Sequence, residues 1–312
     1  MESERNEMTE MTRPSGKARQ ARRLLLLLAL LLMMLLLPSF ALYTYAEVLT
    51  LPMDETGGVP PHPWGYTDDG YEDPSIRVQL EFGREGDTNW TAVRIRLANA
   101  SQLRTLKAAP YGSTREVQGA ALARRVKSVL AIGGDFFIFH NHGYIVRQGQ
   151  FYRNRPSGEQ DVLVIDREGN LDVLIRPEKA DIEAYEARRR DDIANAFTFG
   201  PALVTGGERV KELTELKGDP GRAQRIALCQ TGELEYLVVY SEGPSDKDSA
   251  GLSVPQFADL VASFPGVRTA YNLDGGSSAT IVFKGEKING PKSQRGRSIG
   301  DIIYFASAWA AD

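Results

Sequence analysis

The stretch of the chain that carries most information about chemistry is residues 271–280, where Asp274 is followed by Gly275 and Gly276. Two glycines after an aspartate let the backbone bend tightly and approach a ligand closely. Successive backbone N–H groups in such a turn can form a concave site for an anion, with Asp274 beside it as an acid, a base or a metal ligand. An Asp-Gly turn in an ordinary hairpin is the alternative, and such turns are common. These residues alone leave both interpretations open.

A second carboxylate follows glycines at residues 131–137, where Gly133, Gly134 and Asp135 end a short predicted strand. Two carboxylates at such strand ends can meet in one cleft. Glycosidic cleavage commonly uses a pair of carboxylates, one protonating the leaving oxygen and the other assisting attack at the sugar carbon. The alternative for Asp135 is an exposed aspartate in a strand-end turn.

Two arginines are candidates for binding an anion. Arg225 begins a predicted buried strand, from which a guanidinium can reach a phosphate with two hydrogen bonds. Arg297, next to Gly296, allows the same interpretation, and a surface ion pair is the alternative for both arginines. His140 and His142 are a weak indication of a metal site at this spacing, and we predict that they are loop residues.

The composition limits the classes of function. The 312 residues include 42% hydrophobic residues, enough for a sizeable core. The net charge of -4 and the pI of about 5.6 give no basic footprint for nucleic acid. The single cysteine, Cys229, excludes an intramolecular disulfide and lies in an apolar run, so we predict a small buried side chain there.

A hydrophobic segment near the N-terminus predicts a membrane anchor. Every residue from 24 to 37 is Leu, Ala or Met, and a helix over 24–46 exceeds the ~20 residues that cross a bilayer. Basic residues precede the segment and acidic residues follow it, which places 1–23 in the cytoplasm and the rest outside. A signal peptide cleaved near Ala46 is the rival interpretation, and both interpretations export the domain.

The exported part is predicted to be an α+β domain over 76–312, with a large mixed or antiparallel sheet and a few flanking helices. Residues 47–75 are rich in Pro, Gly, Asp and Tyr and predict a linker. Period-two alternation predicts strands over 76–82 and 92–97. Hairpins are predicted at 144–152 and 162–175, helices at 113–126 and 253–264, and further strands at 127–132, 197–204, 226–230, 234–240, 269–273, 279–284 and 302–305.

Taken together, five stretches in order resemble the phosphodiester glycosidase family over roughly residues 100–306. They are 133–137, 199–204, 225–227, 272–280 and the downstream pair Asn289 and Arg297. The family shows an Asn-Leu-Asp-Gly-Gly-Gly-Ser loop, a Gly-Pro-x-Leu segment and an Arg-Thr-Ala-Ile-Gly strand. This chain departs from the family pattern at Gly133, where Asn is usual, and at Ser277, where a third Gly is usual.

The resemblance implies hydrolysis of a sugar-1-phosphodiester into a sugar and a phosphomonoester. Asp274 and Asp135 are then expected to attack the sugar or to activate water. Arg225 and Arg297, with the N–H groups of the two glycines after Asp274, are expected to stabilise the phosphate. Substrate contacts are expected from Gly134, Asn272, Gly275, Gly276, Ser277, Ser278 and Asn289.

Because the domain is predicted to lie outside the cytoplasm, the expected substrate is an envelope or extracellular glycopolymer, such as an exopolysaccharide. No feature of the sequence requires a cofactor. Binding of a divalent cation at Asp135 or Asp274 remains an open alternative. The chief alternative, prompted by Gly133, is a non-catalytic glycan-binding or exopolysaccharide assembly protein. A third possibility is a metal-dependent phosphodiesterase that cuts the P–O bond. Such an enzyme would need more histidine or carboxylate ligands for its metal than the sequence offers. The enzyme interpretation requires Asp135, Asp274, Arg225 and Arg297 to line one cleft.

Overall fold

The computed structural model describes residues 47–219, 221–246, 248–290 and 296–310. The predicted cytoplasmic tail, 1–23, and the predicted membrane segment, 24–46, lie outside the described residues. Within the described ranges, no helix combines the length and the apolar character that crossing a membrane requires.

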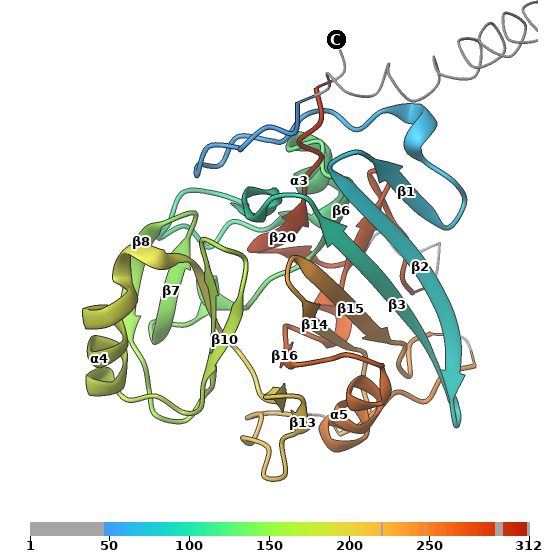
Figure 1. Cartoon of the computed structure of the whole chain (residues 1–312). Coiled ribbons are helices and arrows are strands. Elements are labelled where there is room, and N and C mark those ends of the chain that lie inside the picture. Colours follow the sequence, from blue (N-terminus) through green and yellow to red (C-terminus); the bar gives the residue numbers. More distant parts are fainter. Residues whose placement is uncertain (1–46, 220, 247, 291–295, 311–312) are drawn as a thin grey trace, which may run out of the picture. The chain divides into compact units, whose positions relative to one another are not determined.

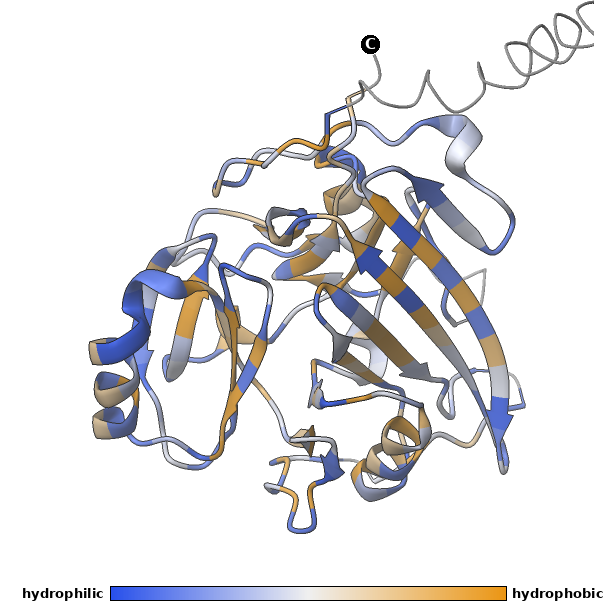
Figure 2. Ribbon diagram, in the orientation of Figure 1, coloured by the Kyte–Doolittle hydropathy of each residue, from blue (hydrophilic) through white to orange (hydrophobic). Residues whose placement is uncertain are grey.

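The largest sheet has eight strands, and every neighbouring pair in it is antiparallel. Strand β2 alternates buried and exposed residues at its start, as the period-two pattern predicts. Figure 2 shows this alternation of hydropathy along β2 and β3. In spatial order the strands are β1 (Gly70–Asp73), β2 (Ile76–Glu85), β3 (Thr88–Leu97), β15 (Glu235–Ser241), β14 (Arg225–Gly232), β16 (Thr269–Asn272), β12 (Ala202–Thr205) and β13 (Glu208–Arg209).

Two five-stranded antiparallel sheets and one small pair complete the strands (Figure 1). The first sheet contains β10 (Leu171–Leu174), β9 (Val162–Asp166), β11 (Ile193–Thr198), β7 (Gly143–Arg147) and β8 (Gln150–Arg155). The second contains β18 (Glu286–Lys287), β17 (Ile281–Phe283), β6 (Leu130–Gly133), β20 (Asp301–Phe305) and β4 (Leu103–Lys107), and β19 (Ser298–Ile299) pairs with β5 (Val117–Gln118). The prediction of an antiparallel, sheet-rich α+β fold is confirmed, with several sheets in place of one large sheet.

The main hydrophobic core is shared by the three large sheets. Ile76 and Val93 of the first sheet pack in one cluster with Leu163 of the second and Ile132 of the third, and all four are buried. Burying each large apolar side chain contributes about 1.5–3 kcal/mol. This common core holds the ends of β6, β14 and β16 in fixed positions, and the candidate site is built from those ends.

In the described part of the chain, three α-helices pack against the sheets: α3 (Gly119–Arg125), α4 (Lys179–Arg189) and α5 (Val254–Ser263). The predicted helix start at Ser253 is confirmed by a pair of reciprocal hydrogen bonds. The Ser253 hydroxyl oxygen accepts from the Gln256 backbone N–H at 3.4 Å, and the Gln256 side-chain oxygen accepts from the Ser253 backbone N–H at 3.0 Å. The hydrophobic face of α5 packs on β12 and β14. One-turn 3-10 helices lie at Pro63–Gly65, Ala100–Gln102, Phe137–Phe139, Arg190–Asp192 and Gly276–Ser278.

Three differences from the predicted boundaries change how a segment is assigned. The predicted linker, 47–75, is part of the folded unit from Val48 onward: it contains β1, and Val59 bridges Ser307. The helix predicted at 113–126 begins only at Gly119, because Val117 and Gln118 pair with β19 as a strand. The strand predicted at 197–204 is two strands of different sheets, β11 and β12, separated at Gly200 and Pro201.

Candidate active site

The loop after β16 is fixed by backbone hydrogen bonds from both sides. The Asp274 N–H donates to the Gly134 carbonyl at 3.3 Å, and the Gly276 N–H donates to the Gln224 carbonyl at 2.9 Å. A Cβ at Gly275 would lie 2.7 Å from the Gln224 oxygen, and Gly276 has φ +55°. Only glycine fits both positions without strain, so this pair of residues serves the close packing of the loop on β6 and β14.

A cleft of about 490 Å³ opens beside this loop. Most of the residues that were predicted to contact substrate line it. The predicted residues in its lining are Arg225, Asp274, Gly275, Gly276, Ser277, Ser278 and Arg297. The cleft therefore brings together three of the four residues on which the enzyme interpretation depends.

Asp274 has an altered acidity in this cleft. Burial raises the pKa of its carboxyl to about 6, and the nearby Ser278 hydroxyl and Arg297 guanidinium only partly oppose this rise. The charges of Asp135 and Glu116 raise the pKa further. A carboxyl that titrates near neutral pH can accept a proton or attack an electrophile at physiological pH, which matches the requirements of a catalytic base or nucleophile.

The two predicted arginines differ in burial and in the number of hydrogen bonds and ion pairs that they form with other residues. Arg225 is buried, and its guanidinium donates to the Leu252 carbonyl at 3.1 Å and forms an ion pair with Asp219. The Arg297 side chain is 44% exposed, and its only ion pair within the described residues is a 3.6 Å contact with Glu116. Arg297 is thus the more accessible cation for a ligand in the cleft.

Asp135 does not line the cleft, contrary to the prediction. One of its carboxylate oxygens accepts from Arg147 Nη2 at 2.7 Å, and the other accepts from the Thr198 N–H at 2.9 Å. Arg147 is fully buried and also donates from Nε to Asp301 at 2.8 Å. Both oxygens of Asp135 are therefore engaged in a buried charge cluster behind the loop, which we define as Asp135, Arg147 and Asp301.

Gly134 contributes to this cluster and does not contact the cleft, although a substrate contact was predicted for it. A Cβ at this position would overlap the Asp301 carboxylate. Burial raises the pKa of the Asp301 carboxyl, and the neighbouring Arg147 opposes this rise. Gly134 is required because the Asp301 side chain packs directly against its backbone.

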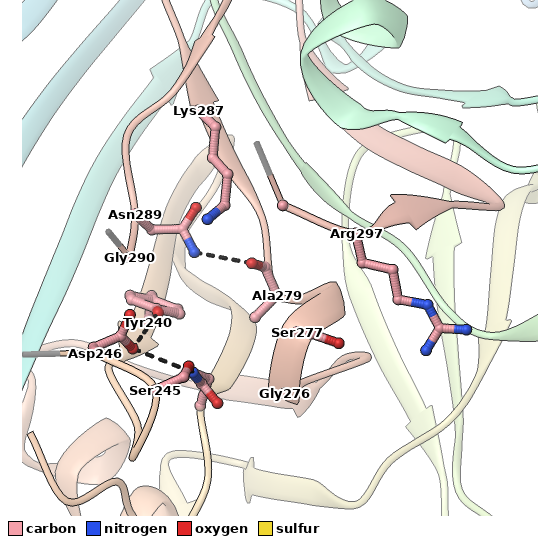
Figure 3. Close-up of a pocket in the computed structure, with 12 residues that line it drawn as sticks. Tyr240, Ser245, Asp246, Gly276, Ser277, Ala279, Lys287, Asn289, Gly290 and Arg297 are labelled. Atoms are coloured by element: carbon pink, nitrogen blue, oxygen red, sulfur yellow. Dashed lines mark hydrogen bonds between the residues drawn. The ribbon is translucent and has the colours of Figure 1, made fainter. Parts of the chain in front are cut away.

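The two predicted asparagines form hydrogen bonds within the protein, and Asn289 also lines a second cavity that shares Gly276, Ser277 and Arg297 with the cleft (Figure 3). Asn272 is buried, and its amide donates to the Gly200 carbonyl at 2.7 Å. Asn289 accepts from the Ile281 N–H at 2.7 Å and donates to the Ala279 carbonyl at 2.9 Å. Neither asparagine lines the Asp274 cleft.

Two histidines that were predicted to be plain loop residues line the cleft. The rings of His140 and His142 are 4.7 Å apart, and His142 Nε2 lies 2.9 Å from the Gln160 side-chain oxygen. Burial lowers the pKa of His140, and the neighbouring His142 lowers it further. Their sequence spacing carried no signal of this placement. Within the described part of the chain, no three His, Cys, Asp or Glu side chains are grouped as ligands for one metal ion.

Comparison with solved structures shows proteins that are similar to this chain in fold. In structure, the chain is similar to the zebrafish N-acetylglucosamine-1-phosphodiester alpha-N-acetylglucosaminidase catalytic domain auto-inhibited by its pro-peptide. That match has a TM-score of 0.60 at 18% identity and covers 84% of this chain and 98% of that chain. A hypothetical protein from Synechocystis matches with a TM-score of 0.49 at 17% identity, over 74% of this chain and 62% of that one.

No curated protein matches the chain in sequence. At 18% identity, the likeness to the zebrafish domain shows the fold alone. A sequence model of the phosphodiester glycosidase family, in contrast, matches residues 126–306, which are more than half of the chain and include Asp274, Arg225 and Arg297. The chain therefore belongs to the phosphodiester glycosidase family.

Proposed function

We propose that the protein hydrolyses a sugar-1-phosphodiester in the Asp274 cleft, releasing a sugar and a phosphomonoester. The observation that carries this proposal is a carboxyl with a pKa of about 6 that shares one cleft with Arg225 and Arg297. Water supplies the oxygen that replaces the phosphate at the sugar carbon. The bond between that carbon and the phosphate oxygen breaks, and the phosphomonoester leaves with the electron pair.

Asp274 supplies the base or the nucleophile in this proposal. Above pH 6 its carboxylate is ionised and can take a proton from water or attack the sugar carbon. A phosphomonoester is a good leaving group, so the reaction places little demand on a second carboxylate as general acid. The burial of Asp135 in an ion pair is therefore compatible with catalysis.

The phosphate is placed between Arg297 and the loop that carries Ser277. Both residues line the cleft together with Asp274. Fixed cationic and N–H donors stabilise charge that develops on a leaving group more effectively than water does, because they are already oriented. Arg225, already paired with Asp219, supports the positive potential of this wall.

Gly133, the departure that prompted the non-catalytic alternative, lies behind the loop. A Cβ there would meet the Ser278 carbonyl at 3.2 Å, and Gly133 is not among the residues that line the cleft. The absence of an amide at this position leaves the wall of the cleft intact.

The location and the polymer substrate are part of the same proposal. The apolar segment 24–46 and the basic residues before it support an anchored domain outside the cytoplasm, where envelope or extracellular glycopolymers carry sugar phosphodiesters. Protease added to intact cells that produce the full chain should then degrade the C-terminal domain. Complete protection of the domain under conditions that digest a known external protein would contradict the export.

Replacing Arg297 with Met is expected to weaken phosphodiester binding. A hydrogen bond to a charged group contributes about 1.5–3 kcal/mol, which corresponds to a roughly 10- to 100-fold fall in kcat/KM. Steady-state kinetics on a sugar-1-phosphodiester would measure this change. Arg96→Met is a matched control, because Arg96 is exposed and lies outside the cleft. An unchanged kcat/KM in Arg297→Met would remove Arg297 from the phosphate site.

The direct test is release of free sugar from a panel of sugar-1-phosphodiesters, each with methanol as the alcohol component. We expect release by the purified protein from at least one member of the panel. Failure with every member, by protein that is folded and still binds glycan, would support the glycan-binding alternative.

A further inference from the structure

A separate cavity, of about 580 Å³, adjoins the Asp274 cleft and is not used by the proposed reaction. Its lining comes from three segments, 111–113, 137–141 and the end of β8, 152–155. We call it the Tyr111 cavity. His140 lines both this cavity and the cleft, so the two spaces are neighbours at that residue.

The position of the Tyr111 cavity decides which part of a substrate can enter it. The proposed phosphate site is made by Arg297 and Ser277, and neither residue lines the Tyr111 cavity. A ligand that extends from the cleft past His140 therefore continues from the sugar and not from the phosphate. Since its volume exceeds the 490 Å³ of the cleft, the Tyr111 cavity has room for at least one further sugar unit.

Three aromatic residues line the Tyr111 cavity. The rings of Tyr111 and Tyr152 are stacked with their centres 4.7 Å apart, and the Phe137 ring is parallel to that of Tyr111 at 6.2 Å. Arg153 Nε donates to the Tyr111 hydroxyl at 3.0 Å. Lys107 Nζ donates to the Tyr152 hydroxyl at 2.9 Å. Both phenol rings are therefore held in place, and flat rings with a polar edge suit the apolar face of a sugar ring.

The charged side chains of Asp, Glu, Lys and Arg type in this lining are all positive. Arg153 and Arg155 line the Tyr111 cavity, and no Asp or Glu is among the described residues that line it. Arg153 is oriented by two backbone carbonyls, accepting at 3.2 Å from Phe137 and at 2.8 Å from His142. Arg155 is exposed and forms no ion pair within the described part of the chain. In a chain with a net charge of -4, two unopposed guanidinium groups beside aromatic rings favour an anionic ligand.

An acyl chain fits this lining less well than a sugar that carries a carboxylate. It would separate the two guanidinium groups from water without replacing their hydrogen bonds, which is unfavourable. A carboxylate accepts from a guanidinium with two parallel hydrogen bonds, and the sugar ring that bears it contacts the aromatic rings. The chemistry of the lining therefore points to an acidic sugar unit.

We propose that the Tyr111 cavity binds an acidic sugar unit, such as a uronic acid, joined to the sugar in the Asp274 cleft, and that Arg155 binds its carboxylate. This inference rests on the proposed function and adds a substrate class. The substrate is then an acidic oligosaccharide whose anomeric end carries the phosphodiester, and not a single sugar. Water adds at the same anomeric carbon, and the products are the free acidic oligosaccharide and a phosphomonoester.

The test compares three methyl phosphodiesters of one sugar: the sugar alone, the sugar carrying glucose and the sugar carrying glucuronic acid. The two disaccharides differ only in the carboxylate, and wild-type kcat/KM should be highest with the acidic one. In Arg155→Met the ratio of kcat/KM for the acidic disaccharide to that for the neutral one should fall about 10- to 100-fold. Arg155→Lys, which keeps a cationic donor, should retain part of the ratio.

The aromatic contact has its own readout. Tyr111→Leu should lower kcat/KM for both disaccharides about 2- to 10-fold relative to the single sugar, because both lose the ring contact. Arg96→Met is the control for both variants, since Arg96 is exposed and lies outside the Tyr111 cavity. Neither ratio should change in this control. Activity on the single-sugar diester reports whether each variant is folded.

A binding measurement separates this inference from the proposed function. Calorimetric titration with the free acidic disaccharide, which has no phosphodiester, should show binding to the wild type that is lost in Arg155→Met. This binding without hydrolysis of any of the three diesters would contradict the proposed function and still support the Tyr111 cavity. Equal wild-type kcat/KM for the two disaccharides, or an unchanged ratio in Arg155→Met, would overturn the inference. Absence of both hydrolysis and binding would overturn it as well.

Discussion

Replacing Asp274 with Asn is expected to lower kcat/KM for sugar release by roughly 100- to 10,000-fold, the range associated with loss of a positioned acid or base. The substitution keeps the size of the side chain and removes the group that we assign to attack or proton transfer. Arg225, Arg297 and the Ser277 loop remain in place, so binding should be largely kept. Single-turnover release of sugar by the two proteins would measure the loss.

The pH dependence gives a second readout of the same residue. The pKa of Asp274 is raised to about 6 by burial, so wild-type kcat/KM should rise with pH through about 6 as the carboxylate forms. A flat profile between pH 4.5 and 7.5 would show that the ionisation of Asp274 does not limit the reaction. This result would separate Asp274 from the chemical step even if the Asn variant were inactive.

The stability of the Asn variant controls for misfolding. Because the pKa of Asp274 is higher in the folded chain than its ordinary value of 3.8, the carboxyl contributes stability below pH 4 that is lost as the pH rises through 6. At pH 8 the folded wild type carries a partly buried charge that the Asn variant lacks. Asp274→Asn should therefore unfold at the same or a higher temperature than wild type at pH 8. A much lower temperature would make its inactivity uninformative.

Replacing Arg147 with Met is expected to destabilise the domain by about 3–5 kcal/mol, because removing one partner of a buried ion pair leaves the other charge uncompensated. Asp135 and Asp301 would both lose their guanidinium contact in a site that water does not reach. Arg147 also lies 3.9 Å from the centre of the Phe197 ring, so packing is lost as well. The melting temperature should fall by about 6–20 °C.

Two further variants separate charge from packing in this cluster. Arg96→Met removes an exposed arginine whose 3.8 Å contact with Glu235 is largely solvated, and its effect should stay below about 1 kcal/mol. Adding Asp135→Asn and Asp301→Asn to Arg147→Met should restore part of the lost stability, since it removes the buried charges. Equal melting temperatures for Arg147→Met and Arg96→Met would show that the cluster does not support the fold.

The sequence predicted those elements whose turn or cap residues lie within a few positions of one another. The hairpin of β7 and β8 was predicted from its turn, and Gln148 and Gly149 both adopt positive φ there. The start of α5 was predicted from Ser253 and Pro255. The helix α4 was missed because only Ile182 and Tyr185 of its residues are buried, so its sequence shows almost no apolar face.

The candidate site was predictable only in part, for reasons of tertiary structure. The loop around Asp274 combines an acid, two glycines and serines in one short stretch, and the structure places all of them at one cleft. Asp135 follows the same local pattern of strand, glycines and acid. Its partner Arg147 comes from another sheet, so no local signal distinguished a buried ion pair from a catalytic acid.

The measurement that tests the central claim most directly is hydrolysis of a sugar-1-phosphodiester in water enriched in oxygen-18, followed by mass spectrometry of both products. Attack at the sugar carbon in the Asp274 cleft predicts that the label enters the released sugar and that the phosphomonoester stays unlabelled. Label in the phosphomonoester would show cleavage of the P–O bond and would contradict the assignment of the protein as a glycosidase.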